Sequence, residues 1–237
     1  MRSSLRSRAS VFVALLLALS AFGAEGRAAA PALPGSYPAA GQLVVPRVTV
    51  RTAPTARAKK LAVLRDFRRT DFKPQIVLAL ELRAEQNGRL WFKISLPGRP
   101  NGRIGWIPAA SASLKPTLAS IVVHRRARTL ELVRDGKVQL RTRVAVGKRG
   151  AETPLGHFYV TSRFTPRNSF LGSYALETSA YSKLSEWPGG GVVGIHGTSR
   201  PDLLGQAVSH GCIRVSNAAA LELKRLAPAG TPITILR

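Results

Sequence analysis

Short runs that alternate apolar and polar positions recur through the first half of the chain. Such runs indicate strands when turn residues separate them. Asn87-Gly88, directly before one of these runs, is a strong hairpin signal. Several short strands joined by tight turns predict a small β-barrel or sandwich. The runs that predict these strands are Leu43–Val50, Ala62–Leu64, Ile76–Leu82, Leu90–Ser95 and Arg103–Pro108.

The second half of the chain shows the same kind of pattern, with Asp135-Gly136 as a further hairpin turn. Residues 164–191 are polar and rich in glycine, and they predict a long loop of the kind that forms lids or binding loops. Asn217 is expected to cap a helix of about ten residues that ends before Pro228. The predicted strands are Ile121–Val123, Thr129–Arg134, Lys137–Val146, Gly156–Arg163, Val192–Ile195 and Pro232–Leu236.

The first thirty residues have the composition of a secretory signal. A basic start is followed by the apolar run Val11–Phe22 and by Ala28-Ala29-Ala30 before Pro31. The apolar run is short for a membrane span, so no transmembrane segment beyond the signal is expected, although an uncleaved N-terminal anchor is the main alternative. The sequence thus predicts export to the periplasm, the cell wall or the extracellular space.

The turn signals and changes in composition divide the chain into five segments. We predict a signal peptide at 1–30, a flexible leader at 31–40, a first β domain at 41–112, a linker at 113–117 and a second β domain at 118–237.

The balance of charge is strongly basic. The chain has 36 Lys+Arg against 12 Asp+Glu, which gives a formal net charge of +24 in 237 residues. Such a charge favours polyanions, among them nucleic acid, anionic lipid surfaces and acidic cell-wall polymers. Because the sequence has no RNA-binding aromatic signature, helix-turn-helix pattern or zinc-finger spacing, no specific nucleic-acid partner is expected. An arginine-rich proteome is the alternative source of the charge.

Cys212 is the only cysteine, and His196 and His210 lie within sixteen positions of it. An exported protein usually pairs its cysteines, and a single cysteine cannot pair within the chain. Such a thiol is either buried and inert or retained for its chemistry. A thiolate is a nucleophile that a neighbouring imidazole can generate. The glycines and polar residues around Cys212 favour the chemical interpretation.

Four segments of the second half resemble, in order, the L,D-transpeptidase catalytic domain, also called the YkuD domain. The resemblance covers about residues 118–237 and implies a β-sandwich with a short C-terminal helix. The segments are Val144-Ala145-Val146-Gly147, Thr153-Pro154-Leu155-Gly156-His157-Phe158, Ile195-His196-Gly197-Thr198 and Ser209-His210-Gly211-Cys212-Ile213-Arg214.

The first β domain resembles a bacterial SH3-like domain, a small β-barrel often found in cell-wall enzymes. The segments that carry this resemblance are Val48–Pro54, Trp91–Ile94 and Gly105–Pro108. Trp91 and Trp106 fit either a ligand groove or the core. The chain is therefore expected to be mainly β, with a small SH3-like barrel followed by an L,D-transpeptidase-type sandwich.

The YkuD resemblance implies that the protein forms or exchanges cross-links between peptidoglycan stem peptides, without a metal or cofactor. Cys212 matches the nucleophile, and His196 matches the histidine that takes the thiol proton. The Gly197 carbonyl is then expected to orient the imidazole. His210 is expected to organise the developing oxyanion, and the N–H groups of Gly211 and Cys212 are candidate oxyanion donors.

Five further residues are candidates for substrate binding. Arg214 could bind a substrate carboxylate through two parallel hydrogen bonds, although a structural salt bridge is an alternative. Ser209 is expected to support the motif. Tyr174, Tyr181 and Trp187 are aromatic residues of the predicted loop that could form walls of the substrate cleft.

Three other functions stay open from the sequence. His196, His210 and Cys212 could be the three ligands of a zinc hydrolase. The chain could instead be a non-catalytic cell-wall-binding protein that relies on its first domain and its charge. An L,D-carboxypeptidase or endopeptidase of the same fold would use the same thiol and replace the acceptor amine with water.

Overall fold

The computed structural model describes residues 31–69, 71–186 and 190–237. These residues form one compact unit with two large β-sheets. The predicted signal peptide at 1–30 lies outside the described residues. Within the described part of the chain, no helix is long and apolar enough to cross a membrane.

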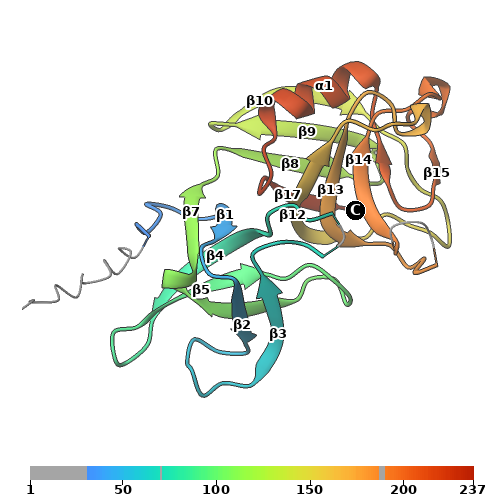
Figure 1. The fold of residues 1–237 in the computed structure, drawn as a ribbon. Coiled ribbons are helices and arrows are strands. Elements are labelled where there is room, and N and C mark those ends of the chain that lie inside the picture. The colour runs from blue at the N-terminus through green and yellow to red at the C-terminus, as the bar shows by residue number, and fades with distance from the viewer. Residues whose placement is uncertain (1–30, 70, 187–189) are drawn as a thin grey trace, which may run out of the picture. The chain divides into compact units, whose positions relative to one another are not determined.

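The N-terminal sheet has seven strands in the order β3-β2-β6-β5-β4-β1-β7. Figure 1 shows β2, β3, β4 and β5 among them. All of its neighbouring strands are antiparallel. Each predicted run of this half overlaps at least one strand. The strands are β1 (Ala39–Leu43), β2 (Arg47–Arg51), β3 (Lys60–Arg65), β4 (Ile76–Ala84), β5 (Leu90–Ser95), β6 (Ile104–Pro108) and β7 (Ala112–Pro116).

The core of this sheet forms from the apolar positions of the alternating runs, among them Val50, Phe92 and Ile107. Trp91 and Trp106 are both buried, so neither offers its ring to an open groove. Burial of large aromatic side chains is a main source of stability in a small β unit. The resemblance to an SH3-like domain stays a prediction.

Two boundaries of the N-terminal half differ from the predictions. Strand β1 begins at Ala39, inside the predicted leader, and β7 occupies most of the predicted linker. The two strands pair with each other from Ala39–Pro116 to Leu43–Ala112. Small residues and prolines gave no strand signal here, because this pairing depends on partners that are 69 to 77 positions apart in the chain.

The C-terminal sheet has eight strands in the order β10-β9-β8-β17-β12-β13-β14-β16, and β11 and β15 form a separate pair. Most neighbours are antiparallel, but β17 is parallel to β8 and β14 is parallel to β16. The strands are β8 (Ala119–His124), β9 (Thr129–Arg134), β10 (Lys137–Arg143), β11 (Val146–Gly147), β12 (Gly156–Phe164), β13 (Ala175–Tyr181), β14 (Val192–His196), β15 (Ala207–Ser209), β16 (Ile213–Arg214) and β17 (Pro232–Leu236).

Strand β13 lies in the middle of the segment predicted as a long loop, and this prediction was wrong. Ala175–Tyr181 contains no β-branched run, but it pairs with β12 on one side and β14 on the other. Its side chains are mostly buried on both faces. A central strand needs no alternating pattern, because both faces pack against other parts of the protein.

Helix α1 (Asn217–Leu226) has contacts with β10, β13 and β14, and Leu223 and Leu226 are buried in the core of the C-terminal sheet. The helix was predicted, but Asn217 is its first residue rather than its cap. The hydroxyl of Ser216 accepts the N–H of Ala219 and caps the helix. The expectation of a mainly β fold with a short C-terminal helix is confirmed.

Candidate active site

Cys212 follows a tight turn between β15 and β16. The Ser209 hydroxyl donates to the Cys212 carbonyl at 2.6 Å and accepts the Gly211 N–H at 3.1 Å. Thr153 Oγ1 donates to the Gly211 carbonyl at 2.8 Å. Gly211 has φ +120°, and a Cβ there would lie 2.7 Å from that of Ser182, so only glycine fits. The turn therefore fixes the backbone position of Cys212.

The sulfur of Cys212 lies against the edge of β14. The N–H of Gly194 donates to Sγ at 3.4 Å. Burial raises the pKa of the Cys212 thiol, while the Gly194 N–H and the positive charge of Arg214 act in the opposite direction. Because burial is the strongest of these influences, the resting group is a thiol, and a base is needed to generate the thiolate.

His196 is the last residue of β14 and is buried. Its Nδ1 lies 2.6 Å from the Gly197 carbonyl, which can only accept, so Nδ1 carries the proton and Nε2 is left as an acceptor. Burial lowers the pKa of His196 to about 4, with a smaller contribution from Arg214, whereas the carbonyls of Gly197 and Leu171 act to raise it. His196 is therefore a neutral base at pH 7.

The parallel pairing of β14 with β16 brings the cysteine and this histidine together. His196 is opposite Arg214, and Ile195 is opposite Ile213, directly after Cys212. Gly194 lies next to both groups, because its N–H contacts Sγ and a Cβ built on it would lie 3.8 Å from His196 Cδ2. The thiol and the imidazole face the same cavity of about 890 Å³.

Burial of a neutral His196 predicts a loss of stability in acid. The folded-state pKa of about 4 lies below the ordinary value of 6.5, so between these values the unfolded chain binds more protons. The contribution of neutral His196 to the free energy of unfolding is fully present above pH 6.5. It decreases by about 3 kcal/mol as the pH falls toward 4. In urea titrations, His196→Gln should flatten this dependence, and His157→Gln, at an exposed histidine, should not. An unchanged slope in His196→Gln would contradict the assignment.

Asn217 connects helix α1 to two adjacent loops beside His196, one before β13 and one after β14. Its Oδ1 accepts the N–H groups of Ser173, at 3.0 Å, and Thr198, at 3.2 Å. A Cβ on Gly197 would collide with this oxygen, so glycine is required beside His196. The amide of Asn217 therefore holds the Gly197 carbonyl in the position where it orients the imidazole.

We expect Asn217→Ala to lower the free energy of unfolding by about 1 kcal/mol and the rate of Cys212 acylation severalfold. The loss of Oδ1 leaves two loop N–H groups without their acceptor and frees the segment that carries the Gly197 carbonyl. Asn217→Asp keeps an acceptor oxygen and should restore most of the rate. Urea titration and single-turnover acylation give the two quantities, and equal rates in Asn217→Ala and the native protein would contradict this role.

Arg214 is buried beside the thiol, with its guanidinium 5.0 Å from the centre of the Phe170 ring. Its Nε is buried without a hydrogen-bond partner, and Arg214 forms no ion pair with any residue of the described ranges. The salt-bridge alternative therefore has no support. His210 also lines the cavity, and burial, Lys148 and Arg214 lower its pKa.

The remaining predicted residues lie in different environments, and only some of them face the cavity. Tyr181 lines the cavity, and the guanidinium of Arg99 lies 4.8 Å from its ring centre. Tyr174 is buried in the core of the C-terminal sheet and does not line the cavity. Ser209 uses its hydroxyl within the turn. Trp187 lies outside the described residues.

The zinc-hydrolase alternative has no support from the arrangement of side chains. In the part of the chain that the structure describes, His, Cys, Asp and Glu residues form no group of three that could hold a metal ion.

Four contributors to the site were not predicted: Gly194, Thr153, Phe170 and Asn217. Thr153 and Gly194 were within segments already singled out, but their contacts involve residues from distant turns. Asn217 was predicted only as a helix cap, but its side-chain amide binds two loops instead of the helix. Phe170, which contacts Arg214 and lies near His196, gave no local signal.

Part of the chain is similar to known proteins. Residues 119–235 match the YkuD family model, described as the L,D-transpeptidase catalytic domain. The candidate L,D-transpeptidase YkuD of Bacillus subtilis (strain 168) is 38% identical over 117 residues, which is 49% of this chain and 65% of that protein. The candidate L,D-transpeptidase YqjB of the same strain is 32% identical over 124 residues, 48% of this chain and 69% of that protein.

Among solved structures, L,D-transpeptidase 3 from Mycobacterium tuberculosis is 14% identical with a TM-score of 0.47, covering 69% of this chain and 92% of that chain. The match to YkuD spans less than two thirds of that relative's length. The family match and the identity to YqjB show that the chain belongs to the YkuD family of L,D-transpeptidase catalytic domains.

Proposed function

We propose that the chain is an exported cysteine transpeptidase that forms or exchanges L,D cross-links between peptidoglycan stem peptides through a thioester. Membership of the YkuD family supports the reaction class. The observation that carries the proposal is that a half-buried thiol and a neutral histidine whose tautomer is fixed line one cavity, both next to Gly194.

In the first step, Nε2 of His196 takes the proton of the Cys212 thiol as Sγ attacks the carbonyl of the L-configured residue of a stem tetrapeptide. The tetrahedral intermediate then collapses to a thioester. The bond to the terminal D-alanine breaks, and the proton on His196 passes to the amine that leaves. A neutral imidazole suits this cycle, since it must accept a proton first and return it later.

The developing oxyanion needs donors that are fixed before reaction. The Gly211 N–H already donates to Ser209, so we assign this role to the Cys212 N–H, assisted by the positive charge of Arg214. His210, at the cavity wall, organises the same region. The guanidinium of Arg214, which lines the cavity and forms no ion pair with any described residue, is also assigned to bind a substrate oxygen.

In the second step, the amine of another stem peptide attacks the thioester carbonyl. It loses a proton to His196, and the thiolate departs and is reprotonated. A cross-link forms between the two peptides and the enzyme returns to its resting state. Water in place of the amine would give a trimmed peptide, which is the carboxypeptidase outcome.

The signal-like segment 1–30 supports the proposed export, and the net charge of +24 suits retention near anionic cell-wall polymers. Outside the cytoplasm, the thiol would have access to peptidoglycan. Because the chain has no second cysteine, Cys212 cannot be lost to a disulfide within the chain, even in an oxidising compartment.

Incubation of the mature protein with defined muropeptides, followed by separation of products by mass, tests the proposed reaction. We expect cross-linked or exchanged peptides whose formation requires Cys212. Trimmed peptides alone would replace the transpeptidase with a hydrolase of the same fold. The absence of any Cys212-dependent product would contradict an enzymatic role and favour a wall-binding protein.

A further inference from the structure

The N-terminal sheet supplies part of the wall of the cavity that contains Cys212. Five residues from the N-terminal half line this cavity together with the thiol and His196: Arg68, Arg69, Asp71, Gln75 and Pro97. Four of them belong to the connection between β3 and β4, which we call the docking loop (residues 66–75, with residue 70 outside the described ranges). A substrate that fills the cavity must therefore contact both halves of the chain.

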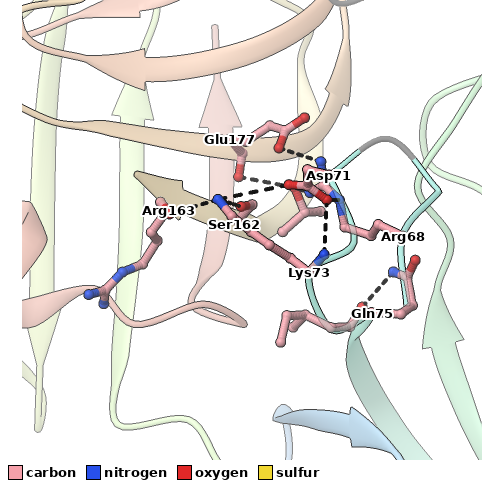
Figure 2. A network of polar contacts seen from close by, with 9 residues as sticks. Arg68, Asp71, Lys73, Gln75, Ser162, Arg163 and Glu177 are labelled. Atoms are coloured by element: carbon pink, nitrogen blue, oxygen red, sulfur yellow. Dashed lines mark hydrogen bonds and ion pairs between the residues drawn. The ribbon is translucent and has the colours of Figure 1, made fainter. Parts of the chain in front are cut away.

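The docking loop is bound to strands β12 and β13 of the C-terminal sheet (Figure 2). Arg68 Nη2 donates to Glu177 Oε2 at 2.6 Å, and this ion pair is largely buried. Lys73 Nζ donates to the Ser162 hydroxyl at 3.0 Å and to the Arg163 carbonyl at 3.2 Å. Two cations from one loop thus hold it against two adjacent strands of the other sheet.

Contacts within the loop keep its shape. The N–H of Arg68 donates to the Lys73 carbonyl at 2.8 Å, and the N–H of Phe72 donates to the Arg68 carbonyl at 3.0 Å. The Asp71 carboxylate lies 3.1 Å from Arg68 and 3.8 Å from Lys73, between the two cations. Because these partners fix the loop at several points, the residues it presents to the cavity are held in place before a ligand binds.

The loop has three cations and the two carboxylates of Asp66 and Asp71, so its charges and that of Glu177 balance formally, but only two of the cations form ion pairs in the described ranges. Arg68 and Lys73 are matched by Glu177 and Asp71. Arg69 is exposed and lines the cavity, and it forms no ion pair with any residue in the described ranges. An arginine at the wall of a cavity of about 890 Å³ offers a planar, permanently charged fork that matches a carboxylate.

We propose that Arg69 binds a carboxylate of the peptide substrate, so that the N-terminal sheet forms part of the substrate-binding site. The ligand class is an acidic peptide, and this inference rests on the proposed function. Arg214 lies beside the thiol, whereas Arg69 comes from the other half of the chain, so the cavity has a second cation for an acidic group on the substrate. The docking loop gives the N-terminal half a direct role in selecting the donor peptide.

The test separates binding from chemistry by using the Cys212→Ala protein, which cannot form a thioester. Calorimetry would measure its affinity for a stem tetrapeptide with free carboxylates and for the same peptide with those groups amidated. Adding Arg69→Gln should weaken binding of the free acid about tenfold, equal to about 1.4 kcal/mol, and should change binding of the amidated peptide little. Arg65, the exposed last residue of β3, does not line the cavity. Arg65→Gln removes the same charge and should change the affinity for neither peptide.

Three results would overturn the inference. Arg69→Gln could weaken binding of both peptides equally, or it could leave the affinity for the free acid unchanged. The parent Cys212→Ala protein could also show no measurable affinity for the free acid. Thermal unfolding of each variant verifies that the fold is retained. Failure of the proposed function would look different. The native protein would then give no acyl transfer, while the carboxylate-dependent effect of Arg69→Gln on binding would persist.

Discussion

Cys212→Ala is expected to abolish acyl transfer from a stem tetrapeptide while the protein stays folded. The thiol is the only sulfur nucleophile in the chain, and its partners in the fold are few. The Gly194 N–H contacts Sγ at 3.4 Å, whereas the turn around Cys212 is fixed by Ser209, Gly211 and Thr153 through other atoms. Removing the sulfur should therefore change the free energy of unfolding by only about 1 kcal/mol.

The measurement combines product analysis by mass with a urea titration of each variant. Ser209→Ala is a matched comparison, because it keeps the thiol but removes the hydroxyl that holds the turn. It should retain a reduced activity and lose more stability than Cys212→Ala. Turnover that survives in Cys212→Ala would rule out the thioester mechanism.

His196→Ala should slow acylation of Cys212 by about a hundredfold at pH 7. With burial holding the pKa of His196 at about 4, the native base is unprotonated across the neutral range, so the native rate should not fall between pH 8 and pH 6 through loss of the base. Without His196, the thiolate must form by itself, and burial raises the pKa of the thiol. The variant rate should then rise about tenfold for each pH unit below that pKa.

Single-turnover acylation rates measured from pH 5 to pH 9 distinguish this role from a structural one. A merely structural loss would lower the rate equally at every pH. His210→Ala is the informative comparison, because His210 lines the same cavity. If the steep pH dependence appeared in His210→Ala and the His196→Ala rate were unchanged, His210 would be the base.

The sequence allowed most of the C-terminal strands to be predicted, because hairpin turns and apolar runs are local signals. Thr129–Arg134 and Pro232–Leu236 have the predicted bounds. Strand β13 was missed because its stability comes from β12 and β14 on its two sides. Strand β7 was missed for a similar reason, since β1 is its partner. Local composition does not encode partners that are distant in the chain.

The motif residues could be identified from the sequence, but their arrangement could not. Cys212 and His196 come together because β14 and β16 run parallel, and two residues of β16 give too short a run to predict. Arg69 was one arginine among many in the sequence. Its position on the cavity wall depends on Glu177 and Ser162, which bind neighbouring residues of its loop from another sheet.

The central claim is that Cys212 carries the acyl group, and intact-protein mass spectrometry during reaction with a stem tetrapeptide tests it most directly. The account predicts a protein heavier by the tetrapeptide minus its terminal D-alanine, with the added mass on the peptide that contains Cys212 and removed by an acceptor amine. Product formation without any such adduct, or an adduct that persists in Cys212→Ala, would contradict it.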